Sequence, residues 1–213
     1  MSSSQGSRAE EAKPATRMRR TDRKRQLLAH AKQLFVTLGY QHTTTEKIAS
    51  AAGVSEPMLY RHFRSKKALF LEVLKEIREA TLNRWQAASA TIPDPLAKLH
   101  AIADSYLGST REHALEYRIM HRSLVETDDE EILAMLRAFY LDSEAVLAKI
   151  ITDGQQAGVF RRSLDPRVGA WELIRTALGY TLTLPLGLPV YQEPDYIPRA
   201  IDCLLHCLLE RDD

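Results

Sequence analysis

The sequence predicts an all-α protein of about nine helices. Apolar residues recur with the 3.6-residue period of a helix in one segment after another, and no segment keeps the strict alternation of a half-buried strand. Glycine and proline lie between these segments, where helices usually end. Helices are expected at residues 21–38, 45–52, 56–63, 65–88, 95–109, 112–124, 129–157, 166–183 and 195–210.

Charge is distributed unevenly along the chain. The formal net charge is only +1, but residues 1–80 carry 16 Lys and Arg against 8 Asp and Glu, and residues 81–213 are acidic. A basic N-terminal part followed by an acidic remainder is expected where one end of a protein binds a polyanion. Composition alone supports two interpretations equally: a site for a polyanion, or a chance distribution of charge together with a basic, disordered tail.

Residues 1–20 are polar, rich in serine and without helical period, so they are expected to form a disordered basic arm. The run RMRRTDRKR, residues 17–25, has two open interpretations. It is either an arm that reaches the minor groove of DNA, as in other helix-turn-helix proteins, or a solubilising tail.

Capping residues mark where the first helices begin and end. Gly39 is expected as the C′ cap of the first helix. Thr44 or Thr45 caps a short second helix, and Ser55 caps a brief third helix. Ser65 caps a long fourth helix.

The second and third helices have the pattern of a helix-turn-helix, in TEKIASAAGVSEPMLYRH at residues 45–62. Ala49 is small enough to let the two helices cross closely, and Gly53 tolerates positive φ at the turn. Apolar side chains are expected where the two helices touch, at Ile48, Ala52, Val54 and Leu59. The third helix leaves large polar or aromatic side chains outside, at Glu56, Pro57, Met58, Tyr60, Arg61 and His62. Such groups suit a surface that reads a DNA groove, so the sequence predicts a DNA-binding protein.

The stretch GYQHTTTEKIASAAGVSEPMLYRHFRSKKALF, residues 39–70, resembles the N-terminal signature of the TetR/AcrR-type bacterial transcriptional regulators. AGVFRRSLDP, residues 157–166, resembles that family's link between its seventh and eighth helices. The resemblance implies a homodimer with a small DNA-binding domain, a larger ligand-binding domain and a four-helix dimer interface. It also implies a repressor of transcription that a small molecule releases from operator DNA.

The resemblance further implies roles for single residues. Thr44 and Thr45 would contact the DNA backbone at the start of the second helix, which suits a phosphate. Tyr60 would reach a phosphate or sugar, and Lys66 a phosphate. Glu56 departs from the family pattern, because a carboxylate repels phosphate, although it could accept a hydrogen bond from cytosine N4. The candidate DNA-contacting residues are Thr44, Thr45, Ser55, Glu56, Pro57, Met58, Tyr60, Arg61, His62 and Lys66.

Three regions are expected: the arm at 1–20, a helix-turn-helix domain at 21–67, and a helical regulatory and dimerisation domain at 68–213. Aromatic residues mixed into the apolar faces of the last region favour a pocket for a small apolar or amphipathic effector. The candidate lining is Trp85, Tyr106, Tyr117, His121, Phe139 and Trp171, with Arg175 as a polar anchor. The alternative is a regulatory domain that responds to a protein partner or to no ligand.

The last two helices have the broadest apolar faces. A helix that is apolar over more than one stripe must bury against two neighbours, so these helices are expected to form the homodimer interface with twofold symmetry. The candidate interface residues are Trp171, Ile174, Leu178, Ile201, Leu204, Leu205 and Leu208.

Other functional classes find little support. Cys203, His206 and Cys207 lie within about one helical turn, but small side chains near a buried face explain them better than a metal site, so no metal or cofactor is expected. No nucleophile motif or phosphate-binding loop indicates an enzyme. The N-terminus lacks the apolar core of a secretory signal, and no apolar run is long enough for a membrane span. A cytoplasmic location is therefore expected.

Overall fold

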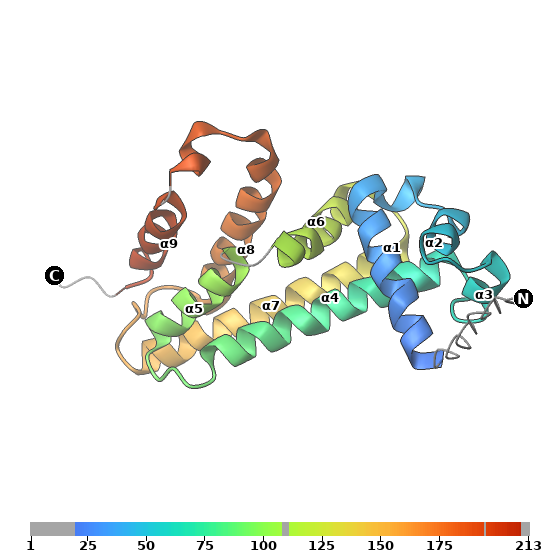
Figure 1. Cartoon of the computed structure of the whole chain (residues 1–213). Helices are drawn as coiled ribbons and strands as arrows, with labels where there is room; N and C mark the ends of the chain where they lie inside the picture. The colour runs from blue at the N-terminus through green and yellow to red at the C-terminus, as the bar shows by residue number, and fades with distance from the viewer. Residues whose placement is uncertain (1–19, 108–110, 194, 210–213) are drawn as a thin grey trace, which may run out of the picture.

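The computed structural model describes residues 20–107, 111–193 and 195–209. Over these residues the chain folds into nine α-helices and two short 3₁₀ helices, with one isolated β-bridge between Phe160 and Leu209. The all-helical fold expected from the sequence is confirmed there (Figure 1). The arm expected at residues 1–20 lies outside the described residues, except for Arg20, which begins the first helix.

The helices follow one another with short connections. In order, they are α1 (Arg20–His42), α2 (Thr45–Ala51), α3 (Glu56–Tyr60), α4 (Lys66–Ser89), α5 (Pro95–Leu107), α6 (Arg111–Glu126), α7 (Glu130–Gln156), α8 (Pro166–Thr183), η1 (Leu184–Leu186), η2 (Pro189–Gln192) and α9 (Tyr196–His206). The third helix is brief, as expected, with five residues. Among the described helices, none combines the length and the apolar character needed to cross a membrane.

The regular part of α1 ends at Gly39. The backbone there has φ 79° and ψ 169°, which side chains other than glycine rarely allow. The buried hydroxyl of Thr43 donates a hydrogen bond to the Gly39 carbonyl at 2.7 Å and so fixes the chain after the break. This break turns the chain towards α2, as the expected C′ cap would do.

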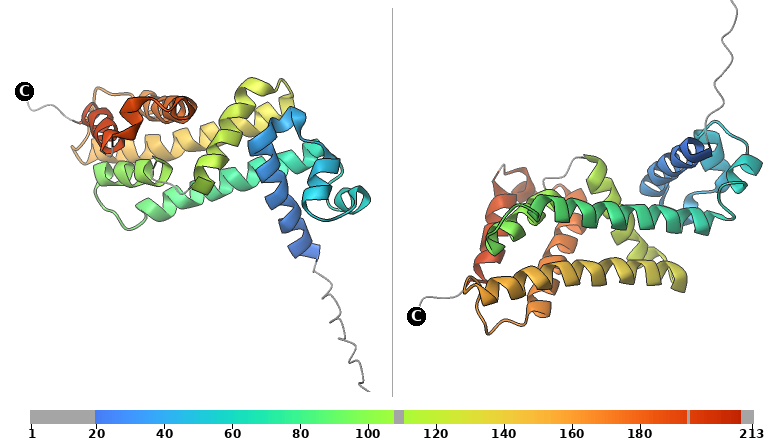
Figure 2. Two further views of the ribbon diagram at one scale, coloured as in Figure 1. Left: turned by 45° about the horizontal axis from the view of Figure 1, so that its top comes forward. Right: turned by 90° about the horizontal axis from the view of Figure 1, so that it is seen from below.

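α4 and α7 run side by side along the length of the molecule (Figures 1 and 2). The 24 residues of α4 span about 36 Å at 1.5 Å per residue. Its first half packs in the same apolar cluster as Ile48 and Leu59 of α2 and α3, while Trp85 packs in a second cluster with α5, α8 and α9. A continuous helix therefore crosses the domain boundary expected after residue 67.

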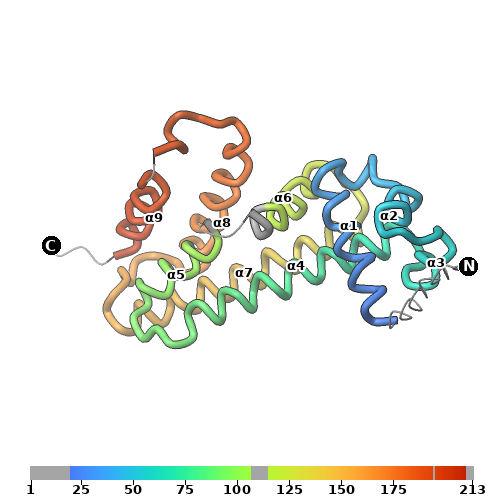
Figure 3. The backbone as a smooth tube through the Cα atoms, viewed as in Figure 1, coloured from blue at the N-terminus to red at the C-terminus, as the bar shows by residue number. Residues whose placement is uncertain are grey.

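α6 connects the two ends of the molecule. It packs against α1 on one side and against α8 on the other, as the trace in Figure 3 shows. Its residues Ile119 and Met120 belong to the same apolar cluster as residues of α1, α2 and α3. The first three helices therefore share a core with α6.

The link between α7 and α8 folds back onto α7. Phe160 is completely buried, and its ring lies so close to Gly154 that a Cβ there would stand 2.1 Å from a ring carbon. The Arg161 N–H donates to the Leu208 carbonyl at 3.1 Å. The link therefore holds the end of α9 against the rest of the bundle.

Candidate DNA interface and ligand cavity

α2 and α3 form a helix-turn-helix held by backbone hydrogen bonds. Gly53 has φ 64° at the turn, and the Val54 N–H donates to the Ala49 carbonyl at 2.9 Å. Ile48 and Leu59, one from each helix, are both 0% exposed. The contact between the helices therefore has the small, apolar character that the sequence predicts.

The start of α2 and the end of α3 meet at the surface. The Tyr60 side chain is 48% exposed, and its hydroxyl lies 3.3 Å from the Thr45 hydroxyl oxygen. Thr44 caps α2, since its hydroxyl oxygen accepts from the Lys47 N–H at 3.2 Å. The hydroxyl proton of Thr44 is left for another acceptor. Three hydroxyl groups thus gather at one exposed helix N-terminus.

The outer face of α3 carries side chains of mixed exposure. Ser55, Pro57 and Arg61 are exposed, whereas Glu56, Met58 and His62 are half-buried. Ser55 stands at the N-cap position, but its side chain makes no capping hydrogen bond.

His62 lies in a basic environment. Its pKa is lowered from the usual value by burial and by the neighbouring charges of Arg20, Arg23 and Lys24. A lowered pKa keeps the imidazole neutral at pH 7, so it presents one donor and one acceptor there.

The side chain of Lys66 contacts Tyr40 at the end of α1. Its ammonium donates to the Tyr40 carbonyl at 2.9 Å and lies 4.3 Å from the centre of the Tyr40 ring. Burial lowers the pKa of this ammonium. The side chain therefore joins the start of α4 to the end of α1, which the sequence did not indicate, and its remaining N–H groups are left for other acceptors.

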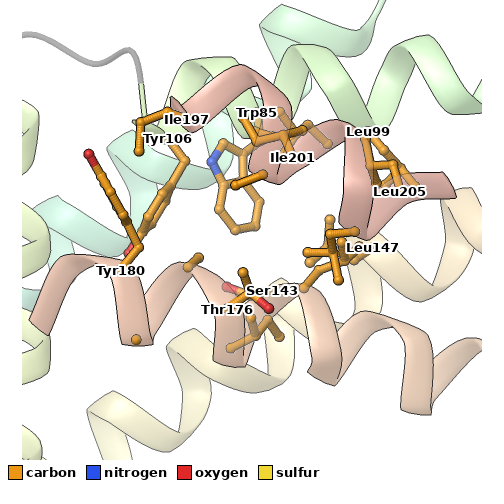
Figure 4. Close-up of a pocket in the computed structure, with 18 of the residues that line it drawn as sticks. Trp85, Leu99, Tyr106, Ser143, Leu147, Thr176, Tyr180, Ile197, Ile201 and Leu205 are labelled. Carbon is orange, nitrogen blue, oxygen red and sulfur yellow. The ribbon is translucent and has the colours of Figure 1, made fainter. Parts of the chain in front are cut away.

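A cavity of about 370 Å³ lies at the end of the molecule opposite the helix-turn-helix (Figure 4). Side chains from α4 to α9 and from η2 line it, and none of the lining residues that the structure describes is Asp, Glu, Lys or Arg. Its volume falls in the range of small-molecule sites.

The structure brings four of the expected ligand-binding residues together in this lining, namely Trp85, Tyr106, His121 and Phe139. The other three lie elsewhere. Tyr117 is buried behind Tyr106, with ring centres 4.0 Å apart. Trp171 donates from its indole nitrogen to the Glu144 carboxylate at 2.8 Å. Arg175 is exposed and pairs with Glu172 at 2.6 Å, because that side of α8 faces solvent.

Much of the lining lies outside the set of residues expected from the sequence. Its other polar members are Tyr140, Ser143, Thr176, Tyr180, Thr183, Tyr191 and Tyr196. The three tyrosines after residue 179 were the available signal, since they fall on or beside the last two helices.

The residues expected at the dimer interface lie largely inside one chain. Ile174, Ile201, Leu204 and Leu205 line the cavity, and Leu208 is buried. Trp171 and Leu178 are half-buried. Several of these side chains thus have neighbours within the same chain, and the interface itself stays a prediction. The exposed apolar side chains of this region are Val168, Leu182, Leu184, Leu186 and Leu188.

Charged contacts join α6 to the helices on either side. The Glu116 carboxylate lies 2.7 Å from the Lys32 ammonium of α1 and 3.0 Å from the Arg84 guanidinium of α4. On the same helix, one turn further, His121 lines the cavity. One helix, α6, therefore contacts both the cavity and α1.

Comparison with known proteins agrees with this architecture. The family model for bacterial regulatory proteins of the tetR family matches residues 27–73. The transcriptional repressor KstR2 of Mycolicibacterium smegmatis is 30% identical over 159 residues, which cover 71% of this chain and 74% of KstR2. The transcriptional activator FasR of the same organism is 30% identical over 137 residues, which cover 64% of this chain and 63% of FasR. The chain thus spans less than two thirds of the FasR length.

A solved structure has the same fold. A transcriptional regulator from Saccharomonospora viridis, in complex with choline, superposes with a TM-score of 0.79 at 24% identity, over 90% of this chain and 100% of that chain. The family match at the helix-turn-helix and the identity with KstR2 over 74% of its length confirm the resemblance seen in the sequence. This chain belongs to the tetR family of bacterial regulatory proteins, and it is a DNA-binding transcriptional regulator rather than an enzyme.

Proposed function

We propose that this regulator is a homodimeric repressor that leaves its operator when a small apolar or amphipathic molecule fills the cavity. The observation that carries the proposal is the cavity itself, about 370 Å³ and lined mainly by apolar and aromatic side chains. α4 begins beside the helix-turn-helix at Lys66 and reaches the cavity at Trp85. A ligand there contacts a helix that also positions the DNA-binding surface.

The DNA contacts are proposed to come from two surfaces. The hydroxyl groups of Thr45 and Tyr60, 3.3 Å apart, suit one backbone phosphate at the start of α2. The exposed side chains of α3, with Arg61 foremost, would face base edges in the major groove. One helix-turn-helix reads few base pairs, so two copies about 34–36 Å apart are expected to read two half-sites.

Ligand binding is proposed to change the distance between these two copies. His121 lines the cavity on α6, and Glu116 of the same helix bonds Lys32 of α1. A ligand that moves α6 or α4 therefore moves the DNA-binding helices with them. The ligand must bind more tightly to the form with low DNA affinity, since equal affinity for both forms shifts nothing. A coupling of about 1–3 kcal/mol is typical of such systems.

The homodimer is proposed to use the outward faces of the last two helices and their connection. Val168 is 51% exposed, Leu182 is 53% exposed and Leu186 is 67% exposed. Several large apolar side chains exposed in one region favour a protein contact. A twofold interface would bury the same patch of both subunits.

Two parts of the proposal have an alternative: repression, and control by a small molecule. The relatives include both a repressor, KstR2, and an activator, FasR, so repression is part of the proposal. The second candidate is a regulator that responds to a protein partner or to no ligand, and the apolar cavity favours the ligand. Action in the cytoplasm, where operator DNA lies, is expected.

The test uses duplex DNA selected from a random pool by the purified full chain. Fluorescence anisotropy of that DNA then reports its release as candidate small molecules are added. Compounds that raise the melting temperature and also release the DNA support the proposal. Compounds that fill the cavity without releasing DNA favour the partner-driven alternative.

A further inference from the structure

Among the described residues, the cavity lining holds no group that would balance a charged ligand. None of these lining residues is Asp, Glu, Lys or Arg. The one histidine among them, His121, is 4% exposed, and burial lowers the pKa of this imidazole to about 4, so it is neutral at pH 7. An ionised group placed here would lose its hydration without gaining a counter-charge.

Three leucines and two tyrosines of the lining lie at opposite sides of the cavity (Figure 4). Leu99, Leu147 and Leu205 gather at one side of the close-up, whereas Tyr106 and Tyr180 lie at the other side. The Tyr106 hydroxyl lies 2.9 Å from the Thr181 hydroxyl oxygen and 3.4 Å from Nε2 of His121. A bound molecule with distinct polar and apolar ends matches this division.

Three polar atoms of the lining residues are buried without a hydrogen-bond partner among the described residues. They are Nε1 of Trp85, Nδ1 of His121 and the hydroxyl oxygen of Tyr140. Buried polar groups in folded proteins nearly always have a partner, so unpaired groups on residues that line a cavity indicate where a ligand bonds. A ligand hydroxyl suits His121 and Tyr140, because it donates to a bare ring nitrogen or accepts from a protonated one, and also accepts from a phenol. The indole N–H of Trp85 only donates, so an acceptor oxygen suits it as well.

We propose that the effector is an uncharged, largely apolar molecule carrying a hydroxyl group that hydrogen-bonds His121 and Tyr140. Its apolar body lies among the leucines at the other side of the cavity. This inference rests on the proposed role of the cavity as the effector site. It narrows the effector to neutral alcohols or phenols and disfavours carboxylates and amines.

The tyrosines of the last two helices offer a competing chemistry. The rings of Tyr180 and Tyr191 are 5.3 Å apart, and those of Tyr191 and Tyr196 are 5.6 Å apart. Aromatic faces in such a group attract quaternary ammonium ions. The proposed selectivity therefore has to be measured against a trimethylammonium compound as well as against acids.

The first experiment measures binding to the full chain by calorimetry for matched sets on a linear ten-carbon chain, a naphthalene and a steroid. Each set contains the alcohol, its methyl ether, the carboxylate and the trimethylammonium compound. On at least one skeleton the alcohol should bind about tenfold or more tighter than either charged member. The proposal is overturned if, on the skeleton whose alcohol binds most tightly, a charged member binds as tightly as that alcohol or more tightly. It is also overturned if none of the alcohols binds.

The second experiment tests the hydroxyl contact. His121→Phe and Tyr140→Phe keep an aromatic ring and should each weaken the alcohol about tenfold, while the parent hydrocarbon of the same skeleton, which has no hydrogen-bonding atom, is unchanged. His100→Phe, which lies outside the lining, is the matched control. Equal loss for alcohol and hydrocarbon in both variants would show a packing effect and overturn the contact. These binding measurements contain no DNA, so their outcome does not depend on DNA release. An alcohol that binds selectively but releases no DNA in the anisotropy assay contradicts only the proposed repressor mechanism.

Discussion

The Lys32 ammonium of α1 lies 2.7 Å from the Glu116 carboxylate of α6, which is only 5% exposed. The same carboxylate also bonds Arg84 of α4 at 3.0 Å. A nearly buried anion thus holds together α1, the long helix α4 and α6, which reaches the cavity. Because removing one member of a buried ion pair leaves its partners uncompensated, this carboxylate is costly to replace.

Glu116→Gln should lower the free energy of unfolding by about 1–3 kcal/mol, because Lys32 and Arg84 lose their counter-charge but keep partial access to water. It should also reduce the effect of a cavity ligand on DNA affinity. Denaturant unfolding and anisotropy with and without ligand measure the two effects. Glu79→Gln, on the exposed side of α4, is the control. Unchanged coupling in a folded Glu116→Gln variant contradicts a role for this contact in signalling.

Tyr60→Ala should weaken operator binding by about 1–3 kcal/mol, because it removes the exposed hydroxyl and ring beside Thr45. Tyr60→Phe, which loses the hydroxyl alone, should retain part of the affinity. Neither variant should change the melting temperature much, since the side chain is 48% exposed. Wild-type affinity in both variants would remove Tyr60 from the interface.

Lys66→Ala is expected to affect both stability and DNA binding. Its ammonium donates to the Tyr40 carbonyl and faces the Tyr40 ring, so the variant should unfold at lower temperature. If Lys66 also contacts phosphate, the slope of log affinity against log salt concentration should become shallower by the contribution of about one phosphate contact. Lys66→Met keeps much of the packing and separates the two effects. An unchanged salt slope for Lys66→Met would leave this lysine a structural role only.

Stability should fall between about pH 6.5 and pH 4 because of His121. Its pKa is lowered to about 4 in the folded chain, mainly by burial, against about 6.5 when unfolded. Within this window the unfolded state binds the proton and the folded state does not, so acid favours unfolding. The loss should approach an order of 3 kcal/mol at the acid end. Denaturant unfolding of the wild type and His121→Phe across this range checks it, and equal pH dependence in both would contradict the assignment.

Leu182→Glu should yield monomers that remain folded, because this leucine is 53% exposed on the outer side of α8. Leu205→Glu should instead unfold the chain, since Leu205 is 1% exposed and lines the cavity. Light scattering gives the mass and circular dichroism the helix content. A stable dimer for Leu182→Glu would exclude this leucine from the interface.

The helix-turn-helix could be predicted from the sequence alone. A cap at Thr44, a small residue at Ala49 and a positive-φ glycine at Gly53 fall within a dozen residues, and their effects are local. Such features act through the backbone and the neighbouring turn, so they can be recognised in the sequence without knowledge of the rest of the fold.

The burial of the apolar faces on the last two helices could not be predicted from the sequence. The period of Ile201 and Leu205 shows that they must leave water, but not whether a cavity in the same chain or a second chain receives them. The direction of α8 placed Arg175 in solvent, although it lies one residue from the lining residue Ile174. The burial of a side chain depends on how neighbouring helices rotate its own helix about its axis. Here α7 and α6 pack against α8, and α5 packs against α9, through contacts between segments far apart in sequence.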